Sequence, residues 1–267
     1  WERVDESSVQ HAGAFLSRMV TRLCLDRLRS AAAQREHYVG VWLPEPLLED
    51  QTGWSPDPQA QAEFAQDVSV AFMLALERLS PLERAAFLLH EVFEMEFDEI
   101  ARHLRRSAAA CRQLASRARQ HVKADDRRRE VQHAEQDRLF SAFAAAVRDL
   151  DVQALAKVLA EDAVMLADGG GRVSALPRPL HGAALIADTL VAFARLPANG
   201  AWRLAPARIN GLSGCLVFDA ASGRLIQTIA LAASVSETGR IGAIYVQRNP
   251  DKLRGVAAAL GVGDVTT

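Results

Sequence analysis

The sequence predicts a multidomain protein that is all-helical in its first half and α+β in its second half, with a curved antiparallel sheet and helices packed on it. Two patterns lead to this fold class. Residues 66–129 have helical periodicity throughout, whereas residues 202–247 hold four strand-like runs separated by turns. The chain has 267 residues, of which 49% are hydrophobic, so it is long enough to bury more than one core.

The segment before residue 66 divides into a helix and a linker. Residues 10–30 place apolar side chains on one side and interleave them with arginines, which predicts an amphipathic helix. Residues 31–65 are rich in proline and acidic residues, which predicts an irregular linker. The first residues are too charged for a secretion signal, and no apolar run approaches the roughly 20 residues of a membrane span. We therefore expect a cytoplasmic protein.

A helix is predicted to begin at Pro81. Ser80 can serve as its N-cap, proline fits the first helical position, and Glu83 completes the pattern of a capping box. The core side of this helix is expected to carry Phe87, Leu88 and Phe93.

Residues 97–122 have the pattern of a DNA-binding helix-turn-helix. A short amphipathic helix ends near Leu104, and a second helix begins after Ser107, whose hydroxyl can cap it. The residue after the first helix is often glycine, because a positive φ relieves the turn, but here it is Arg105. Cys111 is expected to pack in the core, as free cysteines commonly do.

The second helix of this motif carries side chains suited to DNA. The charge reverses at the joint, with six acidic residues and one basic residue from Glu83 to Glu99, and ten basic and two acidic residues from Arg102 to Arg129. This asymmetry favours nucleic acid binding over the alternative of two solvated helical faces. The predicted contacts are Arg112 and Gln113 to base edges, and Ser116, Arg117, Arg119 and Lys123 to phosphates.

The second half changes from helical to strand-like patterns. Helices followed by an antiparallel meander predict an α+β domain. The expected helices are 134–148, 152–160, 183–196 and one after Asn249, and the expected strands are 163–167, 202–210, 215–219, 225–233 and 241–247.

The helical half resembles a known family. Segments 77–84, 97–101 and 112–119 are similar to region 4 of bacterial sigma factors of the extracytoplasmic-function group. The helix before the linker resembles the end of region 2 in that group, whose preceding helices would fall before Trp1. The resemblance implies a factor that directs RNA polymerase core to promoter DNA, with region 4 at the upstream, minus-thirty-five element.

Three further motifs resemble a subgroup with a fused SnoaL-like C-terminal domain, a cone of curved sheet closed by helices. In that subgroup the extra domain replaces a separate anti-sigma protein as the regulator. The implied domains are residues 1–30, the end of region 2; 31–65, the linker; 66–129, region 4; and 130–267, the SnoaL-like domain. The motif residues are Trp42, Leu43, Pro44, Glu45 and Pro46 in the linker, then Asp168, Gly169, Gly170 and Gly171, and finally Asn249, Pro250, Asp251, Lys252 and Leu253.

We expect these motifs to hold the SnoaL-like domain against the sigma regions and to set their spacing. By composition, Asp-Gly-Gly-Gly predicts a flexible loop and Asn-Pro-Asp predicts a turn that begins a helix. The alternative for the linker motif is an ordinary proline-rich spacer.

Some SnoaL-like relatives are polyketide cyclases, which need a carboxylate or histidine facing a cavity. The candidates here are Asp162, Asp168 and His181, and they form no convincing acid/base constellation, so no catalytic residue, metal or cofactor is expected. The apolar interior suits either a small ligand or plain packing. Two alternatives remain open: a SnoaL-type enzyme fused to a DNA-binding domain, and a repressor that binds DNA alone. The three widely spaced cysteines, at 24, 111 and 215, indicate buried or idle thiols.

Overall fold

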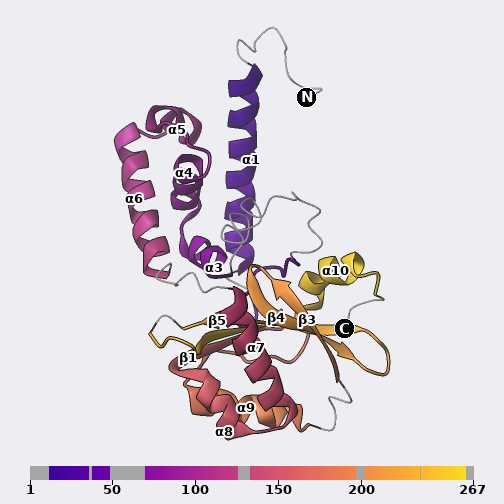
Figure 1. Ribbon diagram of the computed structural model, residues 1–267. Helices are drawn as coiled ribbons and strands as arrows, with labels where there is room; N and C mark the ends of the chain where they lie inside the picture. Colours follow the sequence, from indigo (N-terminus) through magenta and orange to yellow (C-terminus); the bar gives the residue numbers. More distant parts are fainter. Residues whose placement is uncertain are drawn as a thin grey trace. The chain divides into compact units, whose positions relative to one another are not determined.

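The computed structural model describes residues 12–35, 38–48, 70–125, 133–196, 202–234 and 236–262 (Figure 1). The chain forms two compact units. Unit 1 comprises residues 1–37 and 75–126, and unit 2 comprises residues 38–74 and 127–267. Part of the expected linker therefore belongs to the same unit as the sheet.

Unit 1 is helical. Its core joins α1 to the helix-turn-helix, because Leu25 of α1 is buried in the same apolar cluster as Ile100, Leu104 and Cys111. The helices are α1 (Ala12–Arg35), α4 (Pro81–Glu91), α5 (Phe97–Leu104) and α6 (Ala108–Asp125), with α3 (Val70–Arg78) crossing the division between the units.

Local signals set the ends of these helices as the sequence predicts. Ser80 and Glu83 form the expected capping box, with Pro81 at the first helical position. The Ser107 hydroxyl accepts a hydrogen bond from the Ala110 amide at 3.1 Å, which confirms its capping role. Arg105 ends α5 in the left-handed conformation, with φ of 53°, where glycine was the expected residue type.

Unit 2 is built on a six-stranded sheet with the order β2-β1-β6-β5-β4-β3. All neighbouring strands are antiparallel except β1 and β6, which are parallel, so the sheet is mixed at one place. Helix α9 (Ala183–Ala194) intervenes between β1 and the β3–β6 meander, and such a crossover permits parallel pairing where a hairpin would not. The strands are β1 (Leu159–Asp168), β2 (Leu180–His181), β3 (Trp202–Ile209), β4 (Leu212–Asp219), β5 (Leu225–Ala233) and β6 (Ile241–Gln247).

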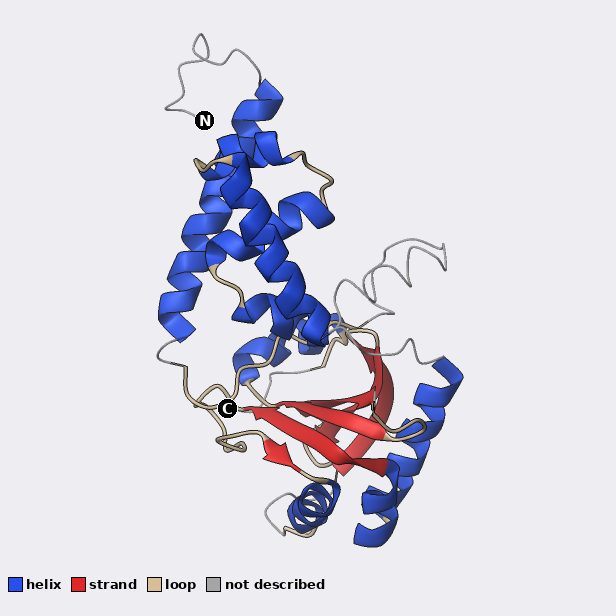
Figure 2. Cartoon of the chain, turned by 90° about the vertical axis from the view of Figure 1, so that its left-hand side faces the viewer, coloured by secondary structure: helices blue, strands red, loops and turns tan. Residues whose placement is uncertain are grey.

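Each face of the sheet has its own core. Helices α7 (His133–Arg148), α8 (Val152–Val158) and α9 cover one face, where Leu155, Ile186 and Ile244 are fully buried. Figure 1 shows α8 and α9 on this side of the sheet and α10 (Pro250–Ala259) on the other, and Figure 2 shows the twist of the strands between them. These buried side chains form part of the apolar interior that the sequence predicts for this domain.

The second face carries the linker. Leu43, Leu48, Val70 and Leu74 join the apolar cluster that α10 forms with the sheet. None of the helices that the structure describes combines the length and apolar character needed to cross a bilayer. Two of the three cysteines, Cys111 and Cys215, are buried, and burial raises the pKa of the Cys215 thiol to about 12.

The left-handed turn at Arg105 gives a test of the helix-turn-helix. Arg105→Gly is expected to stabilise α5 and α6 by about 1 kcal/mol, because glycine adopts a positive φ without the steric cost borne by other residues. Amide hydrogen exchange of these two helices measures the change. Arg102→Gly, which removes the same charge from the interior of α5, should instead destabilise the helix by about 1 kcal/mol. Equal effects of the two variants would contradict the assignment of strain to Arg105.

Candidate functional site

The recognition helix α6 turns most of the predicted DNA-contacting residues outward. Arg112, Gln113 and Ser116 are exposed, and the opposite side of the helix is buried, with Cys111, Leu114, Ala115 and Ala118 in the core. Lys123 lies in α6, but its side chain is outside the described part of the chain. Gln120, which the sequence analysis did not single out, is exposed on the same outward face.

Two of the predicted phosphate contacts are engaged with helix α4. Arg117 pairs with Glu83 at 3.4 Å, and Arg119 pairs with Glu91. Burial works against ionisation of Glu83, but hydrogen bonds from Ser80 and the charge of Arg117 outweigh it and hold the pKa of Glu83 below its usual value. Both arginines keep substantial exposure to solvent, and ion pairs near the surface contribute only about 0–1 kcal/mol.

The base-reading candidate Arg112 is oriented by an aromatic ring. Its guanidinium lies 5.6 Å from the centre of the Phe97 ring, within the range of a cation–π contact. The expectation for Phe93 was wrong. It is 69% exposed, because α4 ends at Glu91 and the turn that follows carries Phe93 away from the core.

The linker motif leads to a second site, centred on Asp168 at the end of β1. This carboxylate is fully buried. Five donors converge on its two oxygens: the Tyr38 hydroxyl at 2.6 Å, the Leu43 amide at 2.9 Å, the Gly170 amide at 2.9 Å, the Lys252 ammonium at 2.7 Å and the Gln247 side-chain amide at 3.3 Å. Two of the five donors belong to the linker. Docking of the linker therefore completes the set of hydrogen bonds that stabilises this buried carboxylate.

Lys252 ties the C-terminal motif to the linker as well. Besides its ion pair with Asp168, the ammonium donates to the Leu43 carbonyl at 2.5 Å. It also lies 4.4 Å from the centre of the Trp42 ring and 4.9 Å from that of Tyr38. The cation therefore has a carboxylate, a carbonyl and two aromatic faces around it, which compensates its loss of water.

The rest of the docked linker, residues 44–48, is held by its main chain. The Pro44 carbonyl accepts from Gln247 at 3.2 Å, and the Glu45 carbonyl accepts from Asn210 at 3.4 Å. The Leu47 amide donates to the Asn210 side chain at 3.1 Å, and its carbonyl accepts from the Asn210 amide at 2.9 Å. Leu43, Pro44 and Pro46 are buried, whereas Glu45 and Leu47 are exposed.

The glycine motif forms a tight turn rather than the flexible loop that its composition suggested. The Gly169 carbonyl accepts from the amides of residues 172 and 173. Gly170 has a φ of 60°, and a Cβ at this position would lie 2.2 Å from the Asn249 side chain. Glycine is needed here because two motifs distant in the sequence come together without room for a side chain.

The C-terminal motif begins α10 and contacts the linker through two of its residues. The Asn249 side chain caps the helix by accepting from the Asp251 amide at 3.0 Å, and it donates to the Tyr38 hydroxyl at 2.9 Å. Pro250 takes the first helical turn and Leu253 is fully buried. Asp251 faces solvent, where it pairs with Arg172 and Arg254.

Three residues of this site were missed by the sequence analysis: Tyr38, Asn210 and Gln247. Their sequence signals are ordinary. Asn210 precedes Gly211 in a hairpin turn, and Gln247 closes an apolar strand, so neither pattern singles out a buried polar contact.

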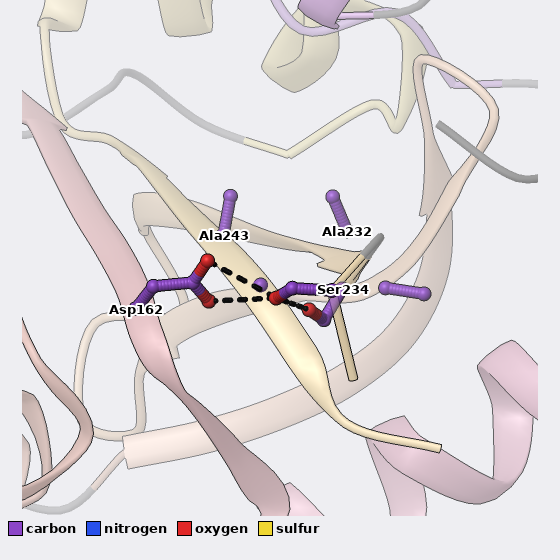
Figure 3. Close-up of a pocket in the computed structure, with 7 residues that line it drawn as sticks. Asp162, Ala232, Ser234 and Ala243 are labelled. Atoms are coloured by element: carbon purple, nitrogen blue, oxygen red, sulfur yellow. Dashed lines mark hydrogen bonds between the residues drawn. The ribbon is translucent and has the colours of Figure 1, made fainter. Parts of the chain in front are cut away.

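The acid/base candidates lie in three different environments. Asp168 binds the linker residues Tyr38 and Leu43, and the exposed His181 lies on β2 opposite Val164. Asp162 lies six residues before Asp168 on β1, in the irregular stretch where the register with β6 shifts between Leu159 and Val164. It lines a pocket of about 290 Å³ together with Ala232 and Ala243, and it accepts a hydrogen bond from the Ser236 hydroxyl at 3.0 Å (Figure 3). Asp162 is the one ionisable residue among those that line this pocket.

Comparisons with known proteins agree with the architecture. Residues 69–122 match the family model Sigma-70, region 4. The chain is 33% identical to the ECF RNA polymerase sigma factor SigJ of Mycobacterium tuberculosis, over 96% of this chain and 83% of that protein. It is 31% identical to the probable ECF RNA polymerase sigma factor SigI of the same species, over 59% of this chain and 53% of that protein. The crystal structure of Mycobacterium tuberculosis SigJ aligns with a TM-score of 0.67 at 31% identity, covering 96% of this chain and 87% of that one.

The ionisation of Tyr38 tests whether the linker is docked in solution. Burial, the hydrogen bond to Asp168 and the negative charge of Asp168 all raise the pKa of Tyr38 and outweigh the opposing hydrogen bond from Asn249. Its contribution to docking is therefore complete below the ordinary value of about 10 and is lost as the pH rises through the higher folded pKa.

Tyrosinate absorbance, taken as the difference between the wild-type and Tyr38→Phe chains, should stay flat through pH 10 and rise only above it. In a Leu43→Asp chain, where the linker is released, the same difference should titrate near 10. A wild-type difference that already titrates near 10 would show an undocked linker.

Proposed function

The chain belongs to the extracytoplasmic-function group of RNA polymerase sigma factors, and from this premise we propose that it directs RNA polymerase core to promoters whose minus-thirty-five element is read by α6. The match of residues 69–122 to sigma-70 region 4 supports this proposal. The outward face of α6 supports it independently, because its exposed Arg and Gln side chains are the types that read base edges.

In this proposal the N-terminal half of α6 enters the major groove. Arg112 and Gln113 meet base edges, and Ser116 lies beside the backbone. Arg117 and Arg119 exchange their carboxylates on α4 for DNA phosphates, which replaces one weak, exposed ion pair by another. These two arginines supply affinity that depends on salt, and the first two residues supply sequence discrimination.

Arg112→Ala is expected to weaken binding to the cognate promoter by about 1–3 kcal/mol, the usual worth of a bidentate arginine–guanine contact, with little loss on scrambled DNA. Fluorescence anisotropy on both duplexes at one salt concentration measures the difference. Arg119→Ala is the matched control, because a lost phosphate contact should weaken binding to both duplexes alike. The same uniform loss for Arg112→Ala would mean that this residue contacts only the backbone.

The C-terminal domain acts in this proposal by holding the linker. Residues 36–69 connect the end of α1 to α3 and, if free and extended, could span about 115 Å. Residues 38–48 are docked on the sheet domain, and Val70 and Leu74 pack in the same unit. The segment between these two anchors therefore begins and ends on one domain and adds little to the distance that the linker can span. The domain would thereby limit how far the two promoter-reading parts can separate once the packing of α1 against the helix-turn-helix opens.

A regulatory role in cis is favoured over an enzymatic one by the use of Asp168. Among the described residues of the domain, Asp168 is the buried carboxylate, and it is saturated by five donors. The remaining candidates, Asp162 and His181, have separate surroundings. The docked linker is the feature that carries the proposal, because it joins the extra domain physically to the segment between the sigma regions.

Linker release should change the tolerance to promoter spacing. On stiff DNA each added base pair moves the two elements apart by about 3.4 Å and rotates one relative to the other by roughly 35°. In transcription with RNA polymerase core, the wild-type chain is expected to show a sharp optimum over spacers that differ by one base pair, and Leu43→Asp a broad one.

Leu47→Asp is the control for this experiment, because it adds the same charge to the same segment at an exposed side chain and keeps the main-chain contacts to Asn210. Identical spacer profiles for the wild-type and Leu43→Asp chains would show that linker docking does not determine which promoter spacings the chain accepts.

A further inference from the structure

We propose that the surface of unit 2 that holds residues 43–48, which we call the linker site, is a peptide-binding site that accepts an extended Leu-Pro-x-Pro segment of another polypeptide in trans. The inference rests on the proposed release of the linker, since the site must be vacated before a second peptide can enter. Asp168, Asn210, Gln247 and Lys252 supply its polar groups.

The linker site contacts the main chain of the segment that it holds. Every hydrogen bond described for residues 43–48 involves a backbone amide or carbonyl of the linker, including both groups of Leu43 and both groups of Leu47. Leu48 adds a bridge to Ile209 at the end of β3. Such contacts do not read side chains, so any segment that adopts the same extended path can make them.

The buried side chains of the docked linker define a short recognition pattern. Leu43 is only 2% exposed and packs in the apolar cluster of the sheet and α10. Pro44 and Pro46 are buried and bring no amide that would need a partner, whereas Glu45 between them is exposed. The chemistry of the ligand is therefore an apolar residue followed by two prolines with any residue between them, in an extended conformation that prolines stabilise in advance.

Contacts within the sheet domain hold the polar groups of the linker site in place. Asp168 keeps the Gly170 amide, Lys252 and Gln247 as partners without any linker residue. The Gln247 side chain is in turn fixed by the Asn249 amide, which donates to its carbonyl oxygen at 2.9 Å. A site prepared in this way loses little entropy when a peptide binds.

The linker itself is the competitor that any such peptide must displace. A tethered segment acts at an effective concentration in the millimolar range, so a peptide in trans gains access mainly when the linker is weakened or pulled away. Binding of the peptide would then favour the released linker, and by linkage release would favour binding of the peptide.

The experiment uses the full chain and a fluorescent peptide with the sequence of residues 38–48. Anisotropy should report saturable binding to the Leu43→Asp chain and at least about tenfold weaker binding to the wild-type chain and to the Leu47→Asp control, whose linkers remain docked. Pro46→Gly, which removes a buried ring without adding charge, is a second release variant in case Leu43→Asp unfolds. Circular dichroism checks the fold of each chain.

Specificity is tested with a peptide that carries aspartate at the position of Leu43. Its affinity for the released chain should fall by roughly 10-fold to 100-fold, because a buried leucine contributes about 1.5–3 kcal/mol. Asn210→Ala in the released chain should also weaken the binding of the unchanged peptide, since it removes the side-chain amide that accepts from the Leu47 amide and donates to the Glu45 carbonyl.

Folded release variants that fail to bind the peptide, or that bind both peptides equally, would overturn the proposal. These outcomes are separate from a failure of linker control. If the Leu43→Asp chain has an altered spacer profile but does not bind the peptide, the proposal of linker docking is supported. Only the proposal of peptide binding in trans is then overturned.

Discussion

The central constraint on unit 2 is a buried carboxylate that needs hydrogen-bond donors from another segment of the chain. Asp168 closes β1 with no exposure to water, and burial of an unpaired charge costs several kcal/mol. Its own domain supplies the charge of Lys252, and the linker supplies Tyr38 and the amide of Leu43. Docking of the linker therefore adds to the stability of the sheet domain by completing the hydrogen bonds of this carboxylate.

The two candidate sites use electrostatics in opposite ways. On α6, Arg117 and Arg119 form individually weak ion pairs near the surface, and the proposed DNA contacts would replace their carboxylates with phosphates. In the linker site the Asp168–Lys252 pair is enclosed by rings and carbonyls, so removal of one partner leaves an uncompensated charge. In the proposed function, the first kind of pair exchanges partners on DNA, whereas the second keeps the path of the linker fixed.

Much of the fold follows from local pattern. The capping box at Ser80, the helix-turn-helix and the bounds of β5 and β6 agree with the sequence, because caps, turns and periodicity act over a few residues. The parallel pairing of β1 with β6 did not follow, since register between distant strands is set by packing. The exposure of Phe93 was likewise unforeseen, because a helix that ends one turn earlier sends the next apolar residue to the surface.

The sequence by itself determined the family resemblance, the outward polar face of α6 and the three motifs that meet at the linker site. Only the tertiary structure decided what those motifs do to one another. It brought Tyr38, Asn210 and Gln247 into the site, and it turned Gly170 into a point of contact with Asn249. The physical reason is that a motif records which residues are present, whereas the satisfaction of a buried charge depends on donors that arrive from 125 residues away in the chain.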